Sequence, residues 1–404
     1  MSKANTIVHQ LRLQVIRTFG KQINTATDCI SLATLLAQKF NTNISPQTLR
    51  RFFGLIKSAS ASSQFTLNLL SKFCGYEDFK DFGHSYNDRE LQLFFGNAEN
   101  TTQHYWDKSE QLCKQITKSP ELLVSTHHRL MSFPMARKYF MENHPLRDML
   151  GTVYAQYFTS YLKFSRTNEA KIFAFGFLFQ SAFLLQNEEF LELFHKKVKE
   201  TALTEEVHVI PAGLKFGIQL LYADLTGNEY LFRKYFAEMK KARLQYIEAS
   251  ERSVCSFEST VLESLIFTNR KKEIKFLIEN NTFQKIKDEV FIPSTRKNTH
   301  IEVWNILCAT AYLKMGDQKN AEEYVQRVNL ENLGIGWKKY YSLMYYFALL
   351  KNSDNIQNTD LLSRLKILIN ETCFTYYENL LENHLEFTSN KTNSVLQNVA
   401  KSNA

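Results

Sequence analysis

Apolar residues recur at helical spacing along most of the chain, and from about residue 90 onward no segment alternates in the way a strand does. Near the start, "DCISLATLLAQKF" (28–40) predicts one helix, "NTNI" a short turn, and "SPQTLRRFFG" (45–54) a second helix. Ser45 can cap this second helix, and Pro46 suits its first position. Further on, "FTLNLLSKFCGYEDFKDF" (65–82) predicts a helix that Gly75 can end in the left-handed conformation, followed by a short aromatic helix. The pattern therefore predicts an all-α fold.

The later part of the chain also repeats. An apolar helix, a short polar turn and another helix recur around Asn187, Asn228, Asn269 and Asp317, at spacings of 41, 41 and 48 residues. Asn143 suggests an earlier turn and "KNSDN" (351–355) a later one. Helical hairpins at such a period are typical of an α-solenoid, in which each hairpin buries its apolar face against its neighbours. We therefore expect a small helical domain over residues 1–88, a solenoid over 89–388, and a polar, frayed tail over 389–404.

Composition supports long helices in a reducing compartment. Phe (32) and Tyr (19) are abundant, whereas Gly (13) and Pro (6) are scarce among 404 residues. The six cysteines lie far apart without a C-x-x-C pair, which argues against a disulfide framework or a zinc site. The first twenty residues lack a signal-peptide core, and the longest apolar stretch, from Ile172, is too short to span a bilayer. These features predict a cytoplasmic protein with no membrane partner.

The net charge of +8 is concentrated at one end of the chain. Residues 1–76 contain nine Lys and Arg residues against a single acid, Asp28, so the remaining residues carry no net charge. A small basic domain suggests a polyanionic partner, with DNA as the first candidate. The alternative at this point is a surface whose charge only favours solubility.

The helix predicted at 45–54 has two different faces. Leu49, Phe52 and Phe53 fall near one side, whereas Gln47 and Arg51 point the opposite way. Arginine pairs with guanine or phosphate, and glutamine pairs with adenine, whereas a plain solvated face is the alternative. The predicted DNA-binding residues, which include lysines that would contact phosphates, are Gln47, Thr48, Arg50, Arg51, Lys57, Lys39 and Lys72. Thr48 is also a candidate for the core.

The first 88 residues resemble a known family. The series Leu32–Ala33–Leu36–Ala37, then Ser45–x–x–Thr48–Leu49–x–Arg51–Phe52–x–Gly54, then Thr66–Leu67–Leu70–Gly75–Tyr76 is similar to the Cro/C1-type (XRE-like) helix-turn-helix. The resemblance is closest to an N-terminal module of bacterial proteins that reads "SpxTLkRfFG…TLdxLaxfxGYxxwxdF". It implies DNA binding through a second helix placed in the major groove. At Phe53 the chain departs from the module, which carries an acidic residue there.

The repeats resemble another family. Residues 304–328 are similar to a tetratricopeptide repeat (TPR), with Ala309, Tyr312, Gly316 and Ala321 at the spacing that lets its two helices pack closely. The other units are longer and richer in Phe and Tyr. A Cro/C1-type domain before a TPR-like array is the architecture of peptide-responsive bacterial regulators.

Enzyme motifs are nearly absent from the sequence. It lacks a P-loop, a G-x-G-x-x-G, a G-x-S-x-G and an H-E-x-x-H pattern. Ser294–x–x–Lys297 is an isolated match, and His127–His128 and His384–Leu385–Glu386 lack a third metal ligand at suitable spacing. We therefore expect neither an enzyme nor a cofactor or bound metal. An enzyme whose catalytic groups converge from distant positions is the least favoured alternative.

Together these features predict a DNA-binding transcriptional regulator. Its helical array would dimerise the protein or bind a peptide or partner protein in its groove. The main alternative is a protein-interaction scaffold whose helix-turn-helix module has lost DNA binding.

Overall fold

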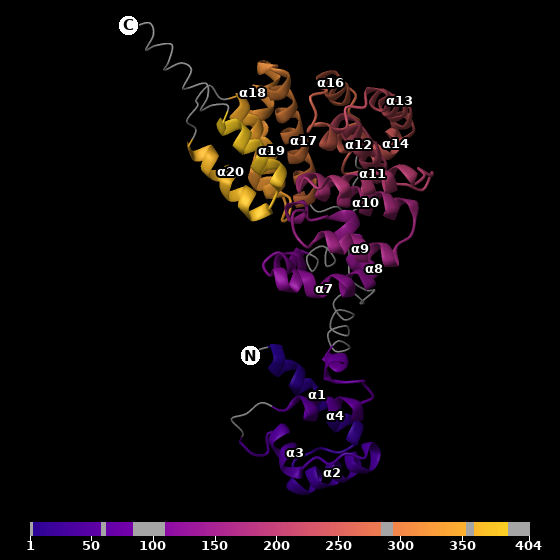
Figure 1. Ribbon diagram of the computed structural model, residues 1–404, viewed down its shortest axis with the longest axis vertical. Coiled ribbons are helices and arrows are strands. Elements are labelled where there is room, and N and C mark those ends of the chain that lie inside the picture. The colour runs from indigo at the N-terminus through magenta and orange to yellow at the C-terminus, as the bar shows by residue number, and fades with distance from the viewer. Residues whose placement is uncertain (1–2, 58–61, 84–109, 284–293, 353–358, 387–404) are drawn as a thin grey trace. The chain divides into compact units, whose positions relative to one another are not determined.

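A computed structural model describes residues 3–57, 62–83, 110–283, 294–352 and 359–386 (Figure 1). Every regular element in these ranges is a helix, as the sequence predicts, and no strand occurs among them. The chain divides into two compact units, residues 1–98 (unit 1) and 99–404 (unit 2). The domain boundary predicted at residue 88 and the tail predicted after residue 388 lie outside the described residues.

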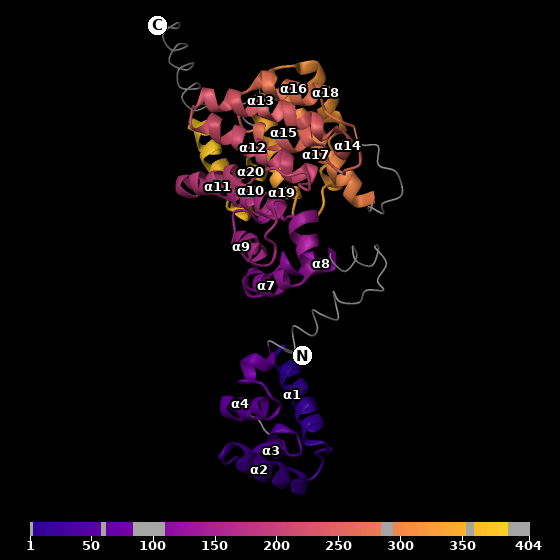
Figure 2. The same ribbon diagram turned by 90° about the vertical axis from the view of Figure 1, so that its right-hand side faces the viewer.

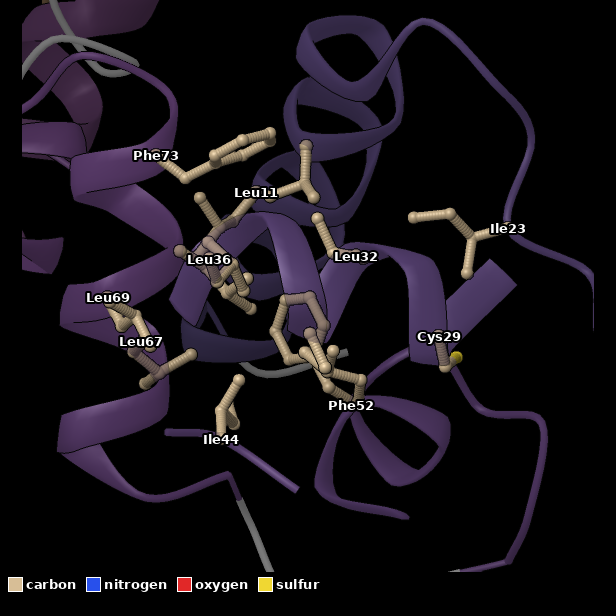
Figure 3. Close-up of a cluster of buried hydrophobic side chains, with 14 of the residues drawn as sticks. Leu11, Ile23, Cys29, Leu32, Leu36, Ile44, Phe52, Leu67, Leu69 and Phe73 are labelled. Atoms are coloured by element: carbon tan, nitrogen blue, oxygen red, sulfur yellow. The ribbon is translucent and has the colours of Figure 1, made fainter. Parts of the chain in front are cut away.

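The described part of unit 1 contains four helices and a short fifth one. They are α1 (Lys3–Phe19), α2 (Ala26–Phe40), α3 (Pro46–Phe52), α4 (Gln64–Phe73) and a short helix over residues 79–83. Helix α2 packs on α3, and α1 packs on α4. Figure 3 shows the shared core, in which the Phe52 ring lies among side chains that include Leu32, Leu36 and Ile44. The helix α1 was not predicted from the sequence, although Leu11 and Val15 place an apolar face on it.

The ends of α3 and α4 follow from local chemistry. The Ser45 hydroxyl accepts the Thr48 N–H (3.0 Å) at the start of α3, as the sequence predicts. At its end, Gly54 takes a φ of +76°, and the Leu55 N–H reaches the Arg50 carbonyl (2.8 Å). Gly75 ends α4 in the same way, with φ of +93°, which confirms its predicted role. These glycines are favoured because L-residues rarely adopt the left-handed region.

Unit 2 begins with short helices and continues as successive helical hairpins (Figures 1 and 2). The first part comprises a helix over residues 110–116, α7 (Pro120–Ser132), α8 (Pro134–Arg137), the π-helix η1 (Lys138–Asn143), the 3-10 helix η2 (Arg147–Met149) and α9 (Ala155–Phe164). The hairpins are α10 (Asn168–Leu184) with α11 (Glu188–Glu200), α12 (Val209–Leu225) with α13 (Glu229–Gln245), α15 (Phe257–Leu265) with α16 (Lys271–Glu279), α17 (Ser294–Met315) with α18 (Gln318–Arg327), and α19 (Lys338–Asn352) with α20 (Thr359–Thr372). The remaining elements are α14 (Ile247–Glu251), η3 (Leu330–Asn332) and a helix over residues 375–386.

The turns of the hairpins lie at the predicted anchors. Asn187, Asn228 and Asp317 each cap the second helix of a hairpin by accepting a backbone N–H three residues on. Asn269 lies in the next turn, but Arg270 is the capping position there. The Asn143 segment is different, because its π-helix leads into a buried segment and not into a second α-helix. Helix α19 ends at Asn352, within the segment predicted as the later turn, and residues 353–358 lie outside the described part of the chain.

The first helices of the hairpins form the interior of unit 2. Helix α12 packs on both α10 and α15, and α19 packs on α17. Close approach of α12 and α15 depends on Gly213 and Gly217, where a Cβ atom would lie within 3 Å of atoms of Thr260 and Ser264. Their partner helices α11 and α18 bury far fewer side chains. The hairpins thus bury one face each against their neighbours.

Candidate nucleic-acid interface

The exposed face of α3 carries the residues predicted to meet DNA. Gln47 and Arg51 are exposed, while Leu49 and Phe52 are 0% and 1% exposed. Residues four apart on a helix lie on the same side, so Gln47 and Arg51 form one polar surface. Phe53 is half-buried, and its ring meets that of Phe52 edge-on with 5.0 Å between centroids. The two phenylalanines therefore anchor α3, and the opposite face is left free.

Thr48 and Arg50 lie at the flanks of this face. Thr48 is half-buried, and its hydroxyl lies 2.8 Å from the Ser45 hydroxyl, so it takes part in the helix cap. Arg50 is also half-buried, next to Cys29 of α2. Burial raises the pKa of the Cys29 thiol, and the Arg50 charge acts against that shift. Both residues are less accessible than Gln47 and Arg51.

The predicted lysines are distributed over other elements of unit 1. Lys57 and Lys72 are exposed. Lys39, at the end of α2, is exposed as well, and its ammonium lies over the rings of Phe40 (5.6 Å) and Phe73 (5.4 Å). Lys39 thus reaches the end of α4, where Lys72 precedes Phe73 in the chain. The structure therefore brings Lys39 of α2 close to α4, the helix that carries Lys72. Gln47 and Arg51 lie on a different helix, α3.

Asp28 is engaged at the start of α2, where it pairs with Lys21 and not with the cations of α3. Its carboxylate accepts from the Thr25 hydroxyl (2.7 Å) and the Thr25 N–H (2.9 Å), and it pairs with Lys21 (2.6 Å). These bonds hold the pKa of Asp28 well below its usual range, with the Lys21 contact as the largest cause. Within the described ranges, none of the seven predicted DNA-binding residues forms an ion pair.

The sequence did not single out Arg12 of α1. Its guanidinium lies over the Phe52 ring, 5.4 Å from the centroid, and burial lowers its pKa. The Nε atom is buried and has no hydrogen-bond partner among the described residues. Arg12 therefore packs against the apolar side of α3, which carries Phe52. The spacing of Val8, Leu11 and Val15 was the available signal for α1, but nothing in it indicated the contact with Phe52.

The residues considered for metal binding or catalysis are dispersed. His127 hydrogen-bonds the Val124 carbonyl, while the His128 ring lies near that of Phe164. No group of three or more His, Cys, Asp or Glu side chains in the described part of the chain is arranged to hold a metal ion. All six cysteines are free thiols. No described helix is long and apolar enough to cross a membrane.

Comparison with known proteins gives no further identification. No family model, curated protein or solved structure matches the chain.

Proposed function

We propose that the protein is a DNA-binding transcriptional regulator in which α2, the turn after it and α3 act as a helix-turn-helix. One observation carries the proposal. The face of α3 opposite its apolar anchor presents Gln47 and Arg51 to solvent, and no acidic side chain pairs with them among the described residues. These two side-chain types recognise base edges in the major groove. A second helix that offers such a face, held by a preceding helix across a short turn, is the docking geometry of this motif.

Charge supports the same proposal. Residues 1–76 carry the whole net charge of +8. Lys39, Lys57 and Lys72 are exposed and would contact phosphates, which position a protein on DNA without reading sequence. In the alternative, a scaffold that no longer binds DNA, the same cations would only maintain solubility.

The test compares the two units on a labelled duplex. We expect residues 1–98 to bind DNA and residues 99–404 not to bind it, as measured by fluorescence anisotropy at several salt concentrations. Each neutralised phosphate releases counterions, so about four contacts would give a slope of about −4 in a plot of log binding constant against log salt concentration. Binding by residues 99–404 alone would refute the assignment, and no binding by either unit would favour the scaffold.

Unit 2 is proposed to act as a TPR-like array that dimerises the protein or binds a peptide or protein. The recurring hairpin caps at Asn187, Asn228 and Asp317 support this role, because stacked hairpins present extended surfaces to partners. Size-exclusion chromatography with light scattering on residues 99–404 tests dimerisation. A monomeric mass at all concentrations would leave partner binding as the role of this unit.

A further inference from the structure

A hollow with a volume of about 450 Å³ opens between the hairpins α17–α18 and α19–α20 of unit 2. Leu313 and Ala321 come from the first hairpin, and Leu349 and Leu361 from the second. Figure 1 shows that the four helices lie in the same part of unit 2. The volume lies within the range of about 300–1,000 Å³ that is usual for ligand-binding pockets.

The floor of this hollow is apolar and incompletely packed. Leu313, Ala321 and Ala348 form a small buried cluster, and Val325 and Leu349 pack against it while remaining half-buried. Protein interiors are normally close-packed, with few voids larger than a water molecule. Covering Val325 and Leu349 with an apolar group would remove their surface from water, which is favourable. The floor therefore suits an apolar side chain.

The rim offers hydrogen-bond acceptors. The Glu322 carboxylate accepts from the Gln318 side-chain amide (3.1 Å) and has no ion-pair partner among the described residues. The Asn352 amide donates to the Ala348 carbonyl (2.9 Å), which leaves the Asn352 side-chain oxygen as an acceptor. Gln318 likewise keeps its side-chain oxygen. An ammonium or guanidinium group has only donors, so it suits a rim that carries acceptors.

The other charges at the rim neutralise each other. Asp360 and Arg364 form an ion pair on α20 with 3.0 Å between Oδ2 and Nε. Arg364 also shares a hydrogen bond with Tyr346, which contributes to a raised pKa for this guanidinium. Glu322 is thus the lining carboxylate whose charge is not balanced by a cation within the described ranges.

We propose that this hollow binds a partner peptide that inserts an apolar side chain next to a lysine or arginine. Gln318, Glu322, Asn352 and Asp360 are all exposed, so the described rim of the hollow is open to solvent. That openness favours a peptide over a small molecule, because small-molecule sites enclose most of their ligand. The inference names the site and chemistry of the partner binding proposed for unit 2, and it does not depend on DNA binding by unit 1.

The first experiment uses the full chain and two fluorescein-labelled octapeptides, one of alternating leucine and lysine and one of alternating leucine and glutamate. We expect saturable binding of the leucine–lysine peptide by anisotropy and at least about tenfold weaker binding of the other, since hydrogen bonds to charged groups are strong. Glu322→Gln should weaken binding of the first peptide by up to about fivefold, because an ion pair at an exposed carboxylate contributes little. Glu323→Gln is the matched control, because Glu323 pairs with Arg327 and does not line the hollow.

The second experiment locates the bound peptide. Methyl-labelled Leu and Val side chains of the full chain should show chemical-shift changes at Leu313, Val325 and Leu349 when the leucine–lysine peptide is added. Val325→Phe, which fills the hollow, should abolish those changes while far-UV circular dichroism confirms that the helices remain.

Three results would overturn the proposal. They are equal binding by the Glu322→Gln and Glu323→Gln variants, unchanged methyl signals at Leu313, Val325 and Leu349, or equal affinity for the two peptides. If n-hexylamine displaced the peptide with an affinity equal to that of the peptide, the ligand of the hollow would be a small amine and not a peptide.

Discussion

The two units use their charged residues in different ways. In unit 2, two arginines pair with buried carboxylates: the buried Arg147 with Glu263 (2.7 Å), and the half-buried Arg243 with Glu258 (2.5 Å). In unit 1, Arg51, Lys57 and Lys72 are exposed and form no ion pair among the described residues. Charge therefore contributes to internal packing in unit 2 and is available to an external partner in unit 1.

The comparison is clearest at residues 144–151, a segment (the inner segment) that joins distant parts of unit 2. Arg147 donates to both Glu263 oxygens, and its guanidinium lies 4.2 Å from the Trp337 ring centroid. Asp148 accepts the Tyr340 N–H (2.8 Å), and Ser181 donates to the Leu150 carbonyl (2.6 Å). The inner segment thus contacts α10, α15 and α19 at once. The buried charge of Arg147 links hairpins within unit 2.

The largest effect is expected from breaking this buried pair. Arg147→Met would leave the Glu263 carboxylate buried without its cation, which should lower the free energy of unfolding by about 3–5 kcal/mol. Urea unfolding of the full chain, followed by circular dichroism, measures the change. Adding Glu263→Leu to Arg147→Met should restore much of the loss, because apolar pairs often replace buried ion pairs without cost. A double variant no more stable than the single one would show that the pair acts only through its packing.

A loss of similar size, confined to unit 1, is expected at Phe52. Truncating a buried aromatic ring usually costs about 3–5 kcal/mol, and Phe52 is 1% exposed with Arg12 against its face. Phe52→Ala should therefore lower the protection of α2 and α3 amides in hydrogen exchange, with the amides of unit 2 unchanged. Phe53→Ala is the matched control, since Phe53 is half-buried and should lose less. Equal losses of protection in the two variants would mean that the deeper burial of Phe52 does not give it a larger contribution to stability than Phe53.

The sequence predicted features that depend on neighbours within a few positions. The Ser45 cap, the Gly75 terminus and the Asn187, Asn228 and Asp317 caps each involve a residue at most five positions away. Arg147 and Glu263, by contrast, are 116 residues apart, and Trp337 donates to the Pro145 carbonyl 192 residues away. No periodicity links such positions, so the inner segment was not predicted.

Helical spacing predicts some features of the candidate site and not others. The opposition of Gln47 and Arg51 to Leu49 and Phe52 follows from helical spacing, and the structure confirms their exposure. The half-burial of Arg50 next to Cys29 depends on how α2 crosses α3. The contact of Arg12 with Phe52 depends on the path of α1. Helical spacing alone determines neither.

A smaller effect, on binding and not on folding, is expected at Arg51. Arg51→Ala should cost about 1–3 kcal/mol of DNA affinity if Arg51 contacts a base in a bidentate way. It should leave the melting temperature nearly unchanged, because the side chain is exposed. Anisotropy titration of the full chain on a selected duplex measures the affinity. Arg17→Ala, an exposed cation on α1, is the matched control. Equal affinities of the Arg51→Ala variant and the parent for every duplex would refute the recognition role and weaken the contrast between the units.

The smallest effect is a pH dependence at Asp28, the acid in unit 1 whose charge stabilises the fold. Its pKa in the folded protein lies well below the usual value of about 3.9, because Lys21 and Thr25 bond the carboxylate. A carboxyl group with a depressed folded-state pKa stabilises the protein fully above its unfolded-state pKa and loses that contribution as pH falls below it. The protection factors of the α2 and α3 amides, which correct for the intrinsic slowing of exchange in acid, should therefore fall as pH falls from about 5 toward 2.

Asp28→Asn isolates this contribution. The variant should be less stable than the parent at neutral pH, because the amide cannot pair with Lys21, and the difference should shrink as the parent carboxylate is protonated in acid. Asp81→Asn provides a control from the same unit, since the Asp81 carboxylate accepts the Glu77 N–H (3.0 Å) and forms no ion pair among the described residues. A constant difference in stability between Asp28→Asn and the parent across this pH range would contradict this prediction. The carboxylate would then act through its shape and hydrogen bonds, and the single acid of residues 1–76 would not stabilise unit 1 by charge.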